Sequence, residues 1–377
     1  YKQCRIGDIY AERSQRGASD MELLSVTMND GVKPRSEIEG KDNSSEDKSN
    51  YKIVRKGDMV YNSMRMWQGA NGISPCDGIV SPAYTVLMPK QEINNGYFAA
   101  LFKSVTLINE FRKNSQGMTS DTWNLKYPQI ETIKVQIPSV SEQDKVSELF
   151  SVLDERIATQ AQLVESLKKY KRGVVRILLS PKHCSIKNVR WTTSRIGDIG
   201  TFIKGAPLSK ADISLEGTPF ILYGELYTTY SEVISNVVRK TQASVDKQYY
   251  SQIGDVIIPT SGETPEEIST ASCVMLPDII LAGDLNIYRC TQVDGRIMSY
   301  ILNHVVNDRI ARIAQGKSIV HVQAAEISKI EITYPDSFSQ KTIIAILAAI
   351  SDRIDQSNAE LRLLYELRKA LLQKLFI

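Results

Sequence analysis

The chain has 377 residues, 42% of them hydrophobic and 24% charged, with a formal net charge of +3, which is ordinary for a globular protein of about two domains. Its longest apolar run, Ile343–Ile350, is far shorter than the roughly 18 residues of a membrane span, and no signal peptide opens the chain. Five scattered cysteines without a CxxC pair argue against a disulfide framework and a metal site such as zinc. We therefore expect a cytoplasmic protein without a membrane partner, and, because the chain opens with Tyr1, missing N-terminal residues.

A unit of about 190 residues occurs twice along the chain. Arg5–Ile9 and Arg195–Ile199 both read Arg-Ile-Gly-Asp-Ile. Three further pairs follow in the same order: Gly57-Asp58 with Gly254-Asp255, Gln116-Gly117 with Gln315-Gly316, and Ile137-Pro138 with Tyr334-Pro335. The offset between matching positions settles at 197, so we predict an internal repeat of the whole fold.

The first part of each unit mixes strand and helix patterns. Short apolar segments between turn residues predict strands at 58–61, 83–88 and 133–137, and again at 255–259, 285–290 and 330–334. Apolar residues at helical spacing predict one helix at 97–112 and one at 296–313. We therefore expect two similar α/β globular domains, at 1–138 and 183–335.

The second part of each unit carries a heptad repeat, which predicts long spacer helices within 139–182 and 336–377. A helix of about 39 residues would be roughly 58 Å long. The first seam is Val146, Leu153, Gln160, Leu167 and Val174 with Phe150, Ile157, Val164, Lys171 and Leu178. Adding 197 gives Ile343, Ile350, Ser357, Leu364 and Leu371 with Leu347, Ile354, Leu361, Arg368 and Leu375. We expect Ser141, and either Ser337 or Ser339, as N-caps.

Charge along these helices favours antiparallel pairing. Acidic residues such as Asp154 and Asp352 lie in the first half of each helix, and basic residues such as Lys169 and Lys369 lie in the second. Antiparallel pairing sets opposite charges against each other and matches the helix dipoles. The predicted fold class is α+β: two similar α/β domains joined by two long antiparallel coiled-coil helices, with a pseudo-twofold internal repeat.

This layout resembles the specificity subunit of type I restriction–modification enzymes over essentially the whole chain. The order of the motifs, the duplication and the heptad helices together carry the resemblance. The matching residues are Arg5–Ile9, Lys56–Asn62, Met64–Ala70, Ser81–Tyr84, Gln116-Gly117, Ile137-Pro138 and Glu142-Gln143 in the first unit, and Gly254-Asp255, Gly283–Asn286, Gln315-Gly316 and Tyr334-Pro335 in the second. The second unit departs from the pattern at Tyr334–Gln340, which leaves the start of its helix open.

The resemblance implies that each globular domain is a target recognition domain that reads one half of a split site in double-stranded DNA. It further implies that the helices fix the separation of the halves and dock two methyltransferase subunits, which use S-adenosylmethionine to methylate adenine, and that restriction subunits can join. On this interpretation the chain itself binds no cofactor and no metal and is not an enzyme. Geometry also favours a spacer role, because two recognition domains held apart by rigid helices require a fixed distance between the half-sites.

Candidate DNA contacts follow predicted strands in both units. Asn62, Arg65 and Gln68 combine the side chains that pair with adenine and guanine edges, beside aromatic residues. Amides and hydroxyls around Gln116 and Thr119 could hold phosphates. The second unit offers Thr260, Ser261, Gln315, Lys317 and His321. The alternative in every case is ordinary structure: solvated polar residues beside a core, or a turn that needs glycine for its backbone angle.

Motifs for catalysis are missing. There is no Asn-Pro-Pro-Tyr motif of an adenine methyltransferase and no Gly-rich cofactor loop. Gly316–Ser318 resembles the end of a P-loop, but Ala311 stands where that motif requires its first glycine. The three histidines are too dispersed for a catalyst. Two rival hypotheses remain at this stage: a standalone DNA-bridging protein unrelated to methylation, and an enzyme whose site the sequence does not reveal. For the basic run Lys168–Arg172, a solvated helix face, a DNA groove and a docking surface all remain open.

Overall fold

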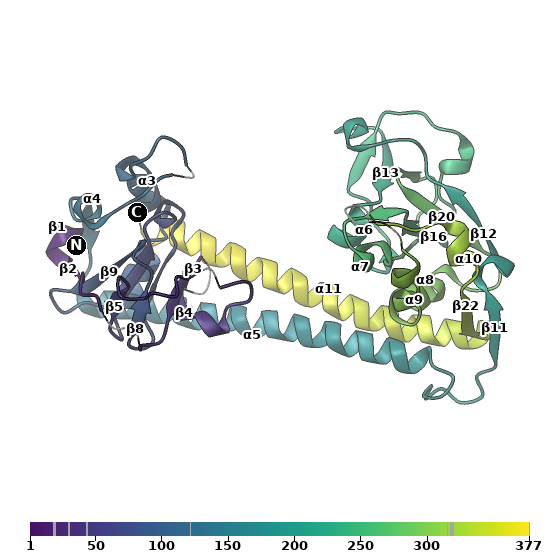
Figure 1. Cartoon of the computed structure of the whole chain (residues 1–377), viewed down its shortest axis with the longest axis horizontal. Coiled ribbons are helices and arrows are strands. Elements are labelled where there is room, and N and C mark those ends of the chain that lie inside the picture. The colour runs from purple at the N-terminus through teal and green to yellow at the C-terminus, as the bar shows by residue number, and fades with distance from the viewer. Residues whose placement is uncertain are drawn as a thin grey trace. The chain divides into compact units, whose positions relative to one another are not determined.

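The computed structural model describes residues 1–17, 20–28, 31–42, 44–120, 122–314, 316 and 320–376. The chain divides into two compact units: unit 1 comprises Tyr1–Gln162 and Asn358–Ile377, and unit 2 comprises Leu163–Ser357. Each unit contains a mixed α/β domain and a section of both long helices, which Figure 1 shows in teal (α5, Val140–Leu178) and yellow (α11, Ser337–Lys374). The expected fold class is confirmed.

Unit 1 is built on an antiparallel sheet of order β2-β9-β6-β7, with the pairs β1·β10, β3·β4 and β5·β8 around it. Its strands are β1 (Lys2–Arg5), β2 (Tyr10–Glu12), β3 (Leu24–Thr27), β4 (Gly31–Pro34), β5 (Lys52–Val54), β6 (Met59–Asn62), β7 (Asn71–Ile73), β8 (Gly78–Val80), β9 (Tyr84–Pro89) and β10 (Lys134–Ile137). Its helices are α1 (Ile6–Ile9), η1 (Arg35–Glu37), η2 (Met66–Gln68), α2 (Asn95–Leu101), α3 (Val105–Asn114) and α4 (Tyr127–Ile130).

Unit 2 repeats this plan with the sheet β12-β20-β16-β18-β14 and the pair β11·β22, and adds β15-β13-β19 and β17·β21. Its strands are β11 (Trp191–Arg195), β12 (Gly200–Lys204), β13 (Thr218–Leu222), β14 (Val233–Ile234), β15 (Arg239–Thr241), β16 (Asp255–Pro259), β17 (Ser261–Gly262), β18 (Ser272–Val274), β19 (Ile280–Ala282), β20 (Leu285–Cys290), β21 (Val320–His321) and β22 (Glu331–Pro335). Its helices are η3 (Ile196–Asp198), η4 (Lys210–Asp212), α6 (Glu225–Thr228), η5 (Lys247–Tyr249), α7 (Pro265–Ile268), α8 (Gly295–His304), α9 (Asn307–Ile313) and α10 (Ala324–Ser328).

The repeated Gly-Asp pair forms the same turn before the central strand of each sheet. Gly57 and Gly254 have φ values of +90° and +96°, a conformation that glycine adopts at little cost. The carboxylates of Asp58 and Asp255 then accept hydrogen bonds, each of 2.9 Å, from backbone amides three residues earlier. The motif therefore recurs because both sheets need this turn.

Each single helix expected at 97–112 and 296–313 is in fact a pair of helices. In unit 1 the break lies at Ser104, whose hydroxyl caps α3 by accepting from the Leu107 amide at 3.3 Å. The apolar residues also change phase there, because five positions separate Phe102 from Leu107. In unit 2 the amides of Val305 and Val306 both donate to the Ile301 carbonyl, which ends α8.

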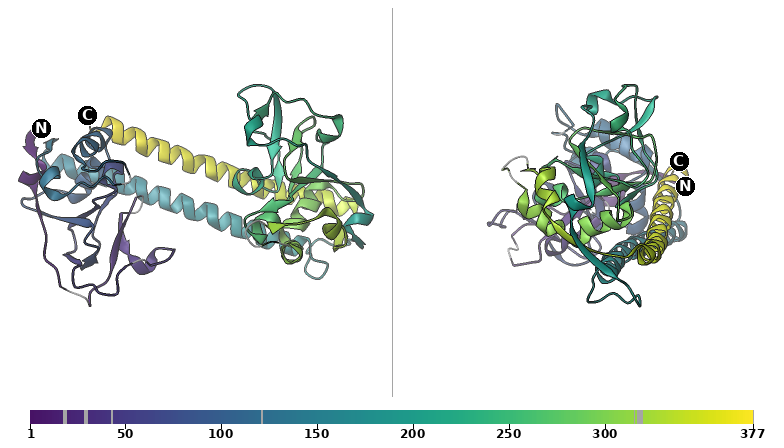
Figure 2. Two further views of the ribbon diagram at one scale, coloured as in Figure 1. Left: turned by 45° about the horizontal axis from the view of Figure 1, so that its top comes forward. Right: turned by 90° about the vertical axis from the view of Figure 1, so that its right-hand side faces the viewer.

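The long helices pair antiparallel within each unit. In unit 1 the side chain of Arg368 donates to Asp154, and Arg156 forms an ion pair with Glu360 at 2.8 Å, so rising numbers in α5 meet falling numbers in α11. In unit 2 Leu178, near the end of α5, shares a hydrophobic cluster with Ile343 from the start of α11. The second half of α5 and the first half of α11 lie side by side in both views of Figure 2. The predicted pairing is confirmed.

The heptad seam is buried or half-buried at all predicted positions except Leu375, which is 39% exposed. Leu372 and Phe376 take its place in the core of unit 1. The long helices reach into the core of unit 1 as well, since Phe150 of α5 belongs to the same hydrophobic cluster as Phe98 and stacks on Phe376 at 5.9 Å. Among the described residues, no helix has the length and apolar character that a membrane crossing requires.

The predicted N-caps were wrong by a few positions. Ser139 rather than Ser141 caps α5, with its hydroxyl accepting from the Glu142 amide at 3.4 Å. Asp336 rather than Ser337 or Ser339 caps α11, by accepting from two backbone amides. The hydrogen bond that Asp336 accepts from the Arg190 amide, together with those at the cap, lowers the pKa of this carboxyl to about 2. In both cases the cap follows directly after a proline, Pro138 just beyond β10 or Pro335 at the end of β22.

Candidate nucleic-acid interface

One backbone hydrogen bond, present in both units, gathers the predicted contact residues. In unit 1 the Leu125 amide donates to the Ser63 carbonyl at 2.9 Å, and in unit 2 the Val322 amide donates to the Thr260 carbonyl at 3.1 Å. This bond ties the loop that leaves the central strand to the segment that follows the two short helices. Residues more than 50 positions apart in the sequence are thereby brought to one surface in each unit.

In unit 1 this surface is aromatic and cationic. The rings of Trp67 and Trp123 meet edge to face with centroids 5.2 Å apart, and the guanidinium of Arg112 lies 5.6 Å from the Trp67 ring. The Trp67 indole donates to the Met64 carbonyl at 3.0 Å, which fixes the ring on its loop. Aromatic rings beside arginine are typical of surfaces that contact nucleotides.

The predicted contact residues of unit 1 lie around this ring pair. Arg65 and Gln68 are exposed on the loop and in η2. Asn62 is half-buried, and its side-chain oxygen accepts from the Met64 amide at 3.0 Å, which fixes its side chain on the loop. Gln116 and Thr119 are exposed on the loop that carries Trp123.

The glycine of this loop has a structural task. Gly117 has a φ of +144°, and a Cβ added there would lie 2.6 Å from the Thr122 carbonyl oxygen. The equivalent Gly316 has a φ of +134°. The turn geometry therefore explains the repeated glycine, while Gln116 and Thr119 remain exposed on either side of Gly117, with the Thr119 hydroxyl 3.4 Å from that of Thr122.

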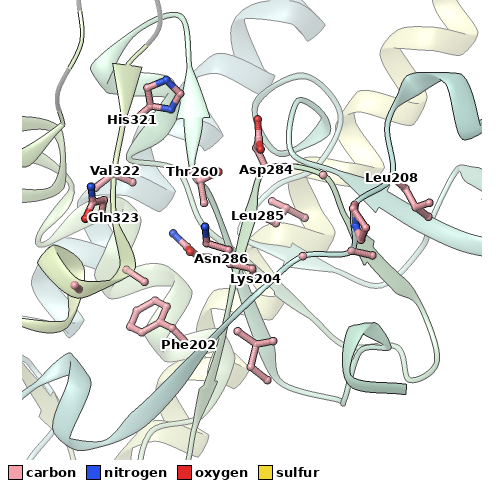
Figure 3. A pocket seen from close by; sticks show the side chains of 17 residues that line it. Phe202, Lys204, Leu208, Thr260, Asp284, Leu285, Asn286, His321, Val322 and Gln323 are labelled. Carbon is pink, nitrogen blue, oxygen red and sulfur yellow. The ribbon is translucent and has the colours of Figure 1, made fainter. Parts of the chain in front are cut away.

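In unit 2 the equivalent surface is a pocket of about 900 Å³ with both polar and apolar lining. Thr260 and His321, both predicted, line it. Lys204, Asp284, Asn286 and Gln323 also line it, and sequence reasoning did not select them. Figure 3 shows His321 and Gln323 on one wall, Leu208 on the opposite side, and Asn286, Lys204 and Thr260 between them.

The other predicted residues of unit 2 differ in position. Ser261 is 5% exposed and donates its hydroxyl to Asp284 at 2.9 Å, so it supports the pocket wall from behind. Its strand β17 pairs with β21, which sets Ser261 opposite His321. Gln315 and Lys317 lie outside the described residues.

The pocket lies where one face of the central sheet changes from apolar to polar. Phe202, Tyr288 and Val256 are neighbours across three strands and face the hydrophobic core. Two residues further along β12 and β20 the same face carries Lys204 opposite Asn286. Residues two apart on a strand point to the same face of the sheet, so Lys204 and Asn286 lie in line with the core residues and extend towards the pocket.

Comparison with known proteins identifies the family. The pattern of the family described as "Type I restriction modification DNA specificity domain" matches residues 4–169 and again 188–364. The chain belongs to this family. Type I specificity subunits are not catalysts themselves, and their family partners are DNA and methyltransferase subunits. The hypothesis of a standalone DNA-bridging protein finds no support among these similarities.

Individual relatives agree with this assignment. The type I restriction enzyme MjaVIII specificity subunit of Methanocaldococcus jannaschii is 23% identical over 357 residues, which cover 86% of this specificity subunit and 79% of that protein. Among solved structures, the type I restriction–modification system S subunit from M. genitalium is 16% identical, with a TM-score of 0.60 over 100% of this chain and 96% of that one. A chain from a study of complex assembly and conformational transition of the type I system is 14% identical, with a TM-score of 0.63 over 100% and 97% of the two chains. These two structures support the fold.

Proposed function

We propose that this specificity subunit selects a bipartite DNA site for an adenine methyltransferase, with one globular domain reading each half-site. The main observation behind the proposal is that the two units share one backbone arrangement at this surface but carry different side chains on it. The same hydrogen bond gathers an aromatic and cationic surface around Trp67 in unit 1 and a pocket around Asn286 in unit 2. Two globular domains with the same backbone geometry and different side chains are suited to two half-sites of different base sequence.

Direct readout in unit 1 would fall to Arg65 and Gln68, and in unit 2 to residues of the pocket such as Thr260 and His321. Gln116 and Thr119 would contact phosphates beside the first half-site. For Gln315 and Lys317 the proposal rests on the sequence alone.

We further propose that the helices dock the methyltransferase subunits. Helix α5 leaves large apolar side chains exposed at intervals of seven or a multiple of seven: Leu149, Leu163, Tyr170 and Ile177, which are 44%, 38%, 60% and 47% exposed. A heptad interval places them along one line of the helix, distinct from the seam that pairs with α11. Apolar side chains in line on an exposed helix favour contact with another protein.

On this proposal two methyltransferase subunits bind, since each unit contributes a similar half of the helical pair. S-adenosylmethionine would be bound by those subunits and not by this chain. Restriction subunits would join the same cytoplasmic complex where it also cuts DNA. Within the basic stretch Lys168–Arg172, the exposed residues Lys169 and Arg172, at the same end of α5 as Tyr170, would then belong to a docking surface, whereas Lys171 is buried against Glu232.

The proposal is tested by co-expression with a methyltransferase subunit in a host without its own adenine methylation, followed by genome-wide mapping of methylated adenines. We expect one motif made of two defined parts with a fixed gap. Replacing Arg65 and Gln68 by alanine should degrade one part only. Methylation of a continuous motif, or the same motif without this chain, would contradict the proposal.

A further inference from the structure

Asn286 has a buried amide group that the fold does not satisfy. The residue is 2% exposed, and its Nδ2 atom finds no hydrogen-bond partner among the residues that the structure describes. A buried donor without a partner destabilises a folded domain, and native proteins rarely retain one without a purpose. Asn286 lines the pocket of unit 2, so this unsatisfied donor lies in the pocket wall.

Lys204 supplies a second donor to the same place. It lies directly opposite Asn286 in the antiparallel pair β12·β20, and side chains of directly opposed residues project from the same face of a sheet. Lys204 is exposed and lines the pocket, and it forms no ion pair within the described part of the chain. Two neighbouring hydrogen-bond donors are complementary to a ligand that has two adjacent hydrogen-bond acceptors.

Asp284 argues against a phosphate as that ligand. Its carboxylate lines the pocket, and one of its oxygens already accepts from the buried Ser261 hydroxyl. A phosphate group would be repelled by a carboxylate held in this way. A base pair carries no net charge, and its edge can present acceptors to Lys204 and Asn286 together with a donor to Asp284.

We infer that this pocket reads a G·C base pair in the half-site of unit 2, with Asn286 and Lys204 on the guanine edge. Guanine presents N7 and O6 as adjacent acceptors in the major groove, and its partner cytosine presents the N4 amino donor. Asn286 and Lys204 donate to N7 and O6, and the free oxygen of Asp284 accepts from the cytosine amino group. No other base pair offers two acceptors beside one donor in this order. The inference rests on the proposed function and names the base that its second domain recognises.

The first experiment uses the complete complex with its methyltransferase subunits and synthetic duplexes of the mapped site. Each guanine of the two half-sites is replaced in turn by 7-deazaguanine, which lacks the N7 acceptor. We expect one position, in the half-site that belongs to unit 2, to weaken binding by about tenfold or more. If that half-site contains no G·C pair, or tolerates every replacement, the inference is wrong while the proposed function stands.

The second experiment assigns the contact to Asn286. Asn286→Leu keeps the branching of the side chain at Cγ and removes the free donor, so the thermal midpoint of the variant should be equal to or higher than that of the parent. Its affinity for the natural site should fall about tenfold, and the 7-deazaguanine duplex should then cost nothing further. A lower thermal midpoint together with unchanged discrimination would show that the amide is structural, which overturns the inference.

Lys204→Met provides an independent variant, with Lys210→Met as its matched control. Lys210 begins η4 in the same domain and lies outside the pocket, so the change of net charge is identical. We expect Lys204→Met to relax the choice of base at one position of the methylation motif, and Lys210→Met to leave the motif unchanged. If the two variants had equal effects, Lys204 would contribute only its positive charge, which would contradict its assignment to the guanine edge. Loss of all sequence-specific methylation in the parent complex, by contrast, would refute the proposed function itself.

Discussion

The buried residues Gln143 and Gln340 make the same pair of hydrogen bonds in the two units. The Nε2 atom of Gln143 donates to the Pro138 carbonyl at 3.0 Å, and its Oε1 accepts from the Asn94 amide at 3.0 Å. Gln340 repeats this with Pro335 and Asp294, both at 2.8 Å. Each glutamine thus connects the first turn of a long helix, the end of a strand and the cap of α2 or α8. The altered sequence around Tyr334–Gln340 retains this residue, and therefore the junction.

Replacing Gln143 or Gln340 by leucine should destabilise the unit that contains it by about 2–4 kcal/mol, because a buried amide and a buried carbonyl lose their partners. Urea denaturation followed by far-UV circular dichroism measures the change. Gln162→Leu, an exposed position on α5, is the matched control and should alter stability by less than about 0.5 kcal/mol. Similar losses in all three variants would show that the two hydrogen bonds contribute little.

Lys171 and Arg368 occupy the same heptad position in the two helices, yet their environments differ. Lys171 donates to Glu232 at 2.8 Å, with side chains 10% and 16% exposed. Arg368 pairs with Asp154, whose side chain is 50% exposed. Lys171→Met should therefore cost about 3 kcal/mol, because the buried Glu232 loses the ammonium group and keeps only its side-chain contact with His304. Arg368→Met should cost about 1 kcal/mol or less, because water takes over the contact. Denaturation of both variants measures the difference, and a larger loss at Arg368 would contradict the prediction.

Acid should weaken unit 2 through Glu232. Burial raises the pKa of this carboxyl, but the hydrogen bond from His304 and the charge of Lys171 outweigh it and lower the pKa from 4.5 to about 2. A depressed pKa means that the stabilisation is complete above about pH 5 and is lost as the pH falls from 4.5 towards 2. The shift corresponds to about 3 kcal/mol. Stability of the parent and of Glu232→Gln, measured between pH 7 and pH 3, should converge at the acid end. Parallel curves would rule out Glu232 as the titrating group.

Lengthening both helices by one heptad should widen the gap between the two half-sites. The insertions belong where each helix passes from one unit to the other, after Gln162 in α5 and after Ser357 in α11. Seven residues add about 10 Å of helix, which corresponds to about three base pairs of DNA. Mapping of methylated adenines measures the gap. Insertion into α5 alone breaks the register of the pair and should abolish methylation, whereas an unchanged gap after the double insertion would contradict a spacer role.

Removal of the Trp67 ring should affect only the half-site read by unit 1. Trp67→Ala removes the contacts with Trp123 and Arg112 that hold the two loops together, and we expect a loss of about tenfold in specific affinity. Trp67→Phe retains an aromatic ring and should recover most of it. Binding to duplexes altered in one half-site at a time distinguishes the domains. A loss that is the same for both half-sites would contradict the assignment.

The sequence predicted the scaffold better than the interface. The ends of β16 and β20 fall where the apolar pattern placed them, and the heptads located the seam, because both depend on neighbours nearby in the chain. Asn286, although part of the matching segment Gly283–Asn286, was not selected as a contact, because its burial depends on strands β12 and β16, which its own segment does not encode. Trp123 was missed for a similar reason, since its contact with Trp67 crosses more than 50 residues.

The division of the two long helices between the units bears on how the protein emerges from the ribosome. Unit 2 is one continuous stretch, Leu163–Ser357, whereas the core of unit 1 needs Leu372 and Phe376 from the last turn of the chain. Domains tend to fold as they are synthesised, in the order in which they appear. The half that is translated first therefore remains incomplete, with the Phe150 side of its helix uncovered, until Leu372 and Phe376 have been synthesised. Nascent-chain proteolysis should therefore find the later half protected before the earlier one.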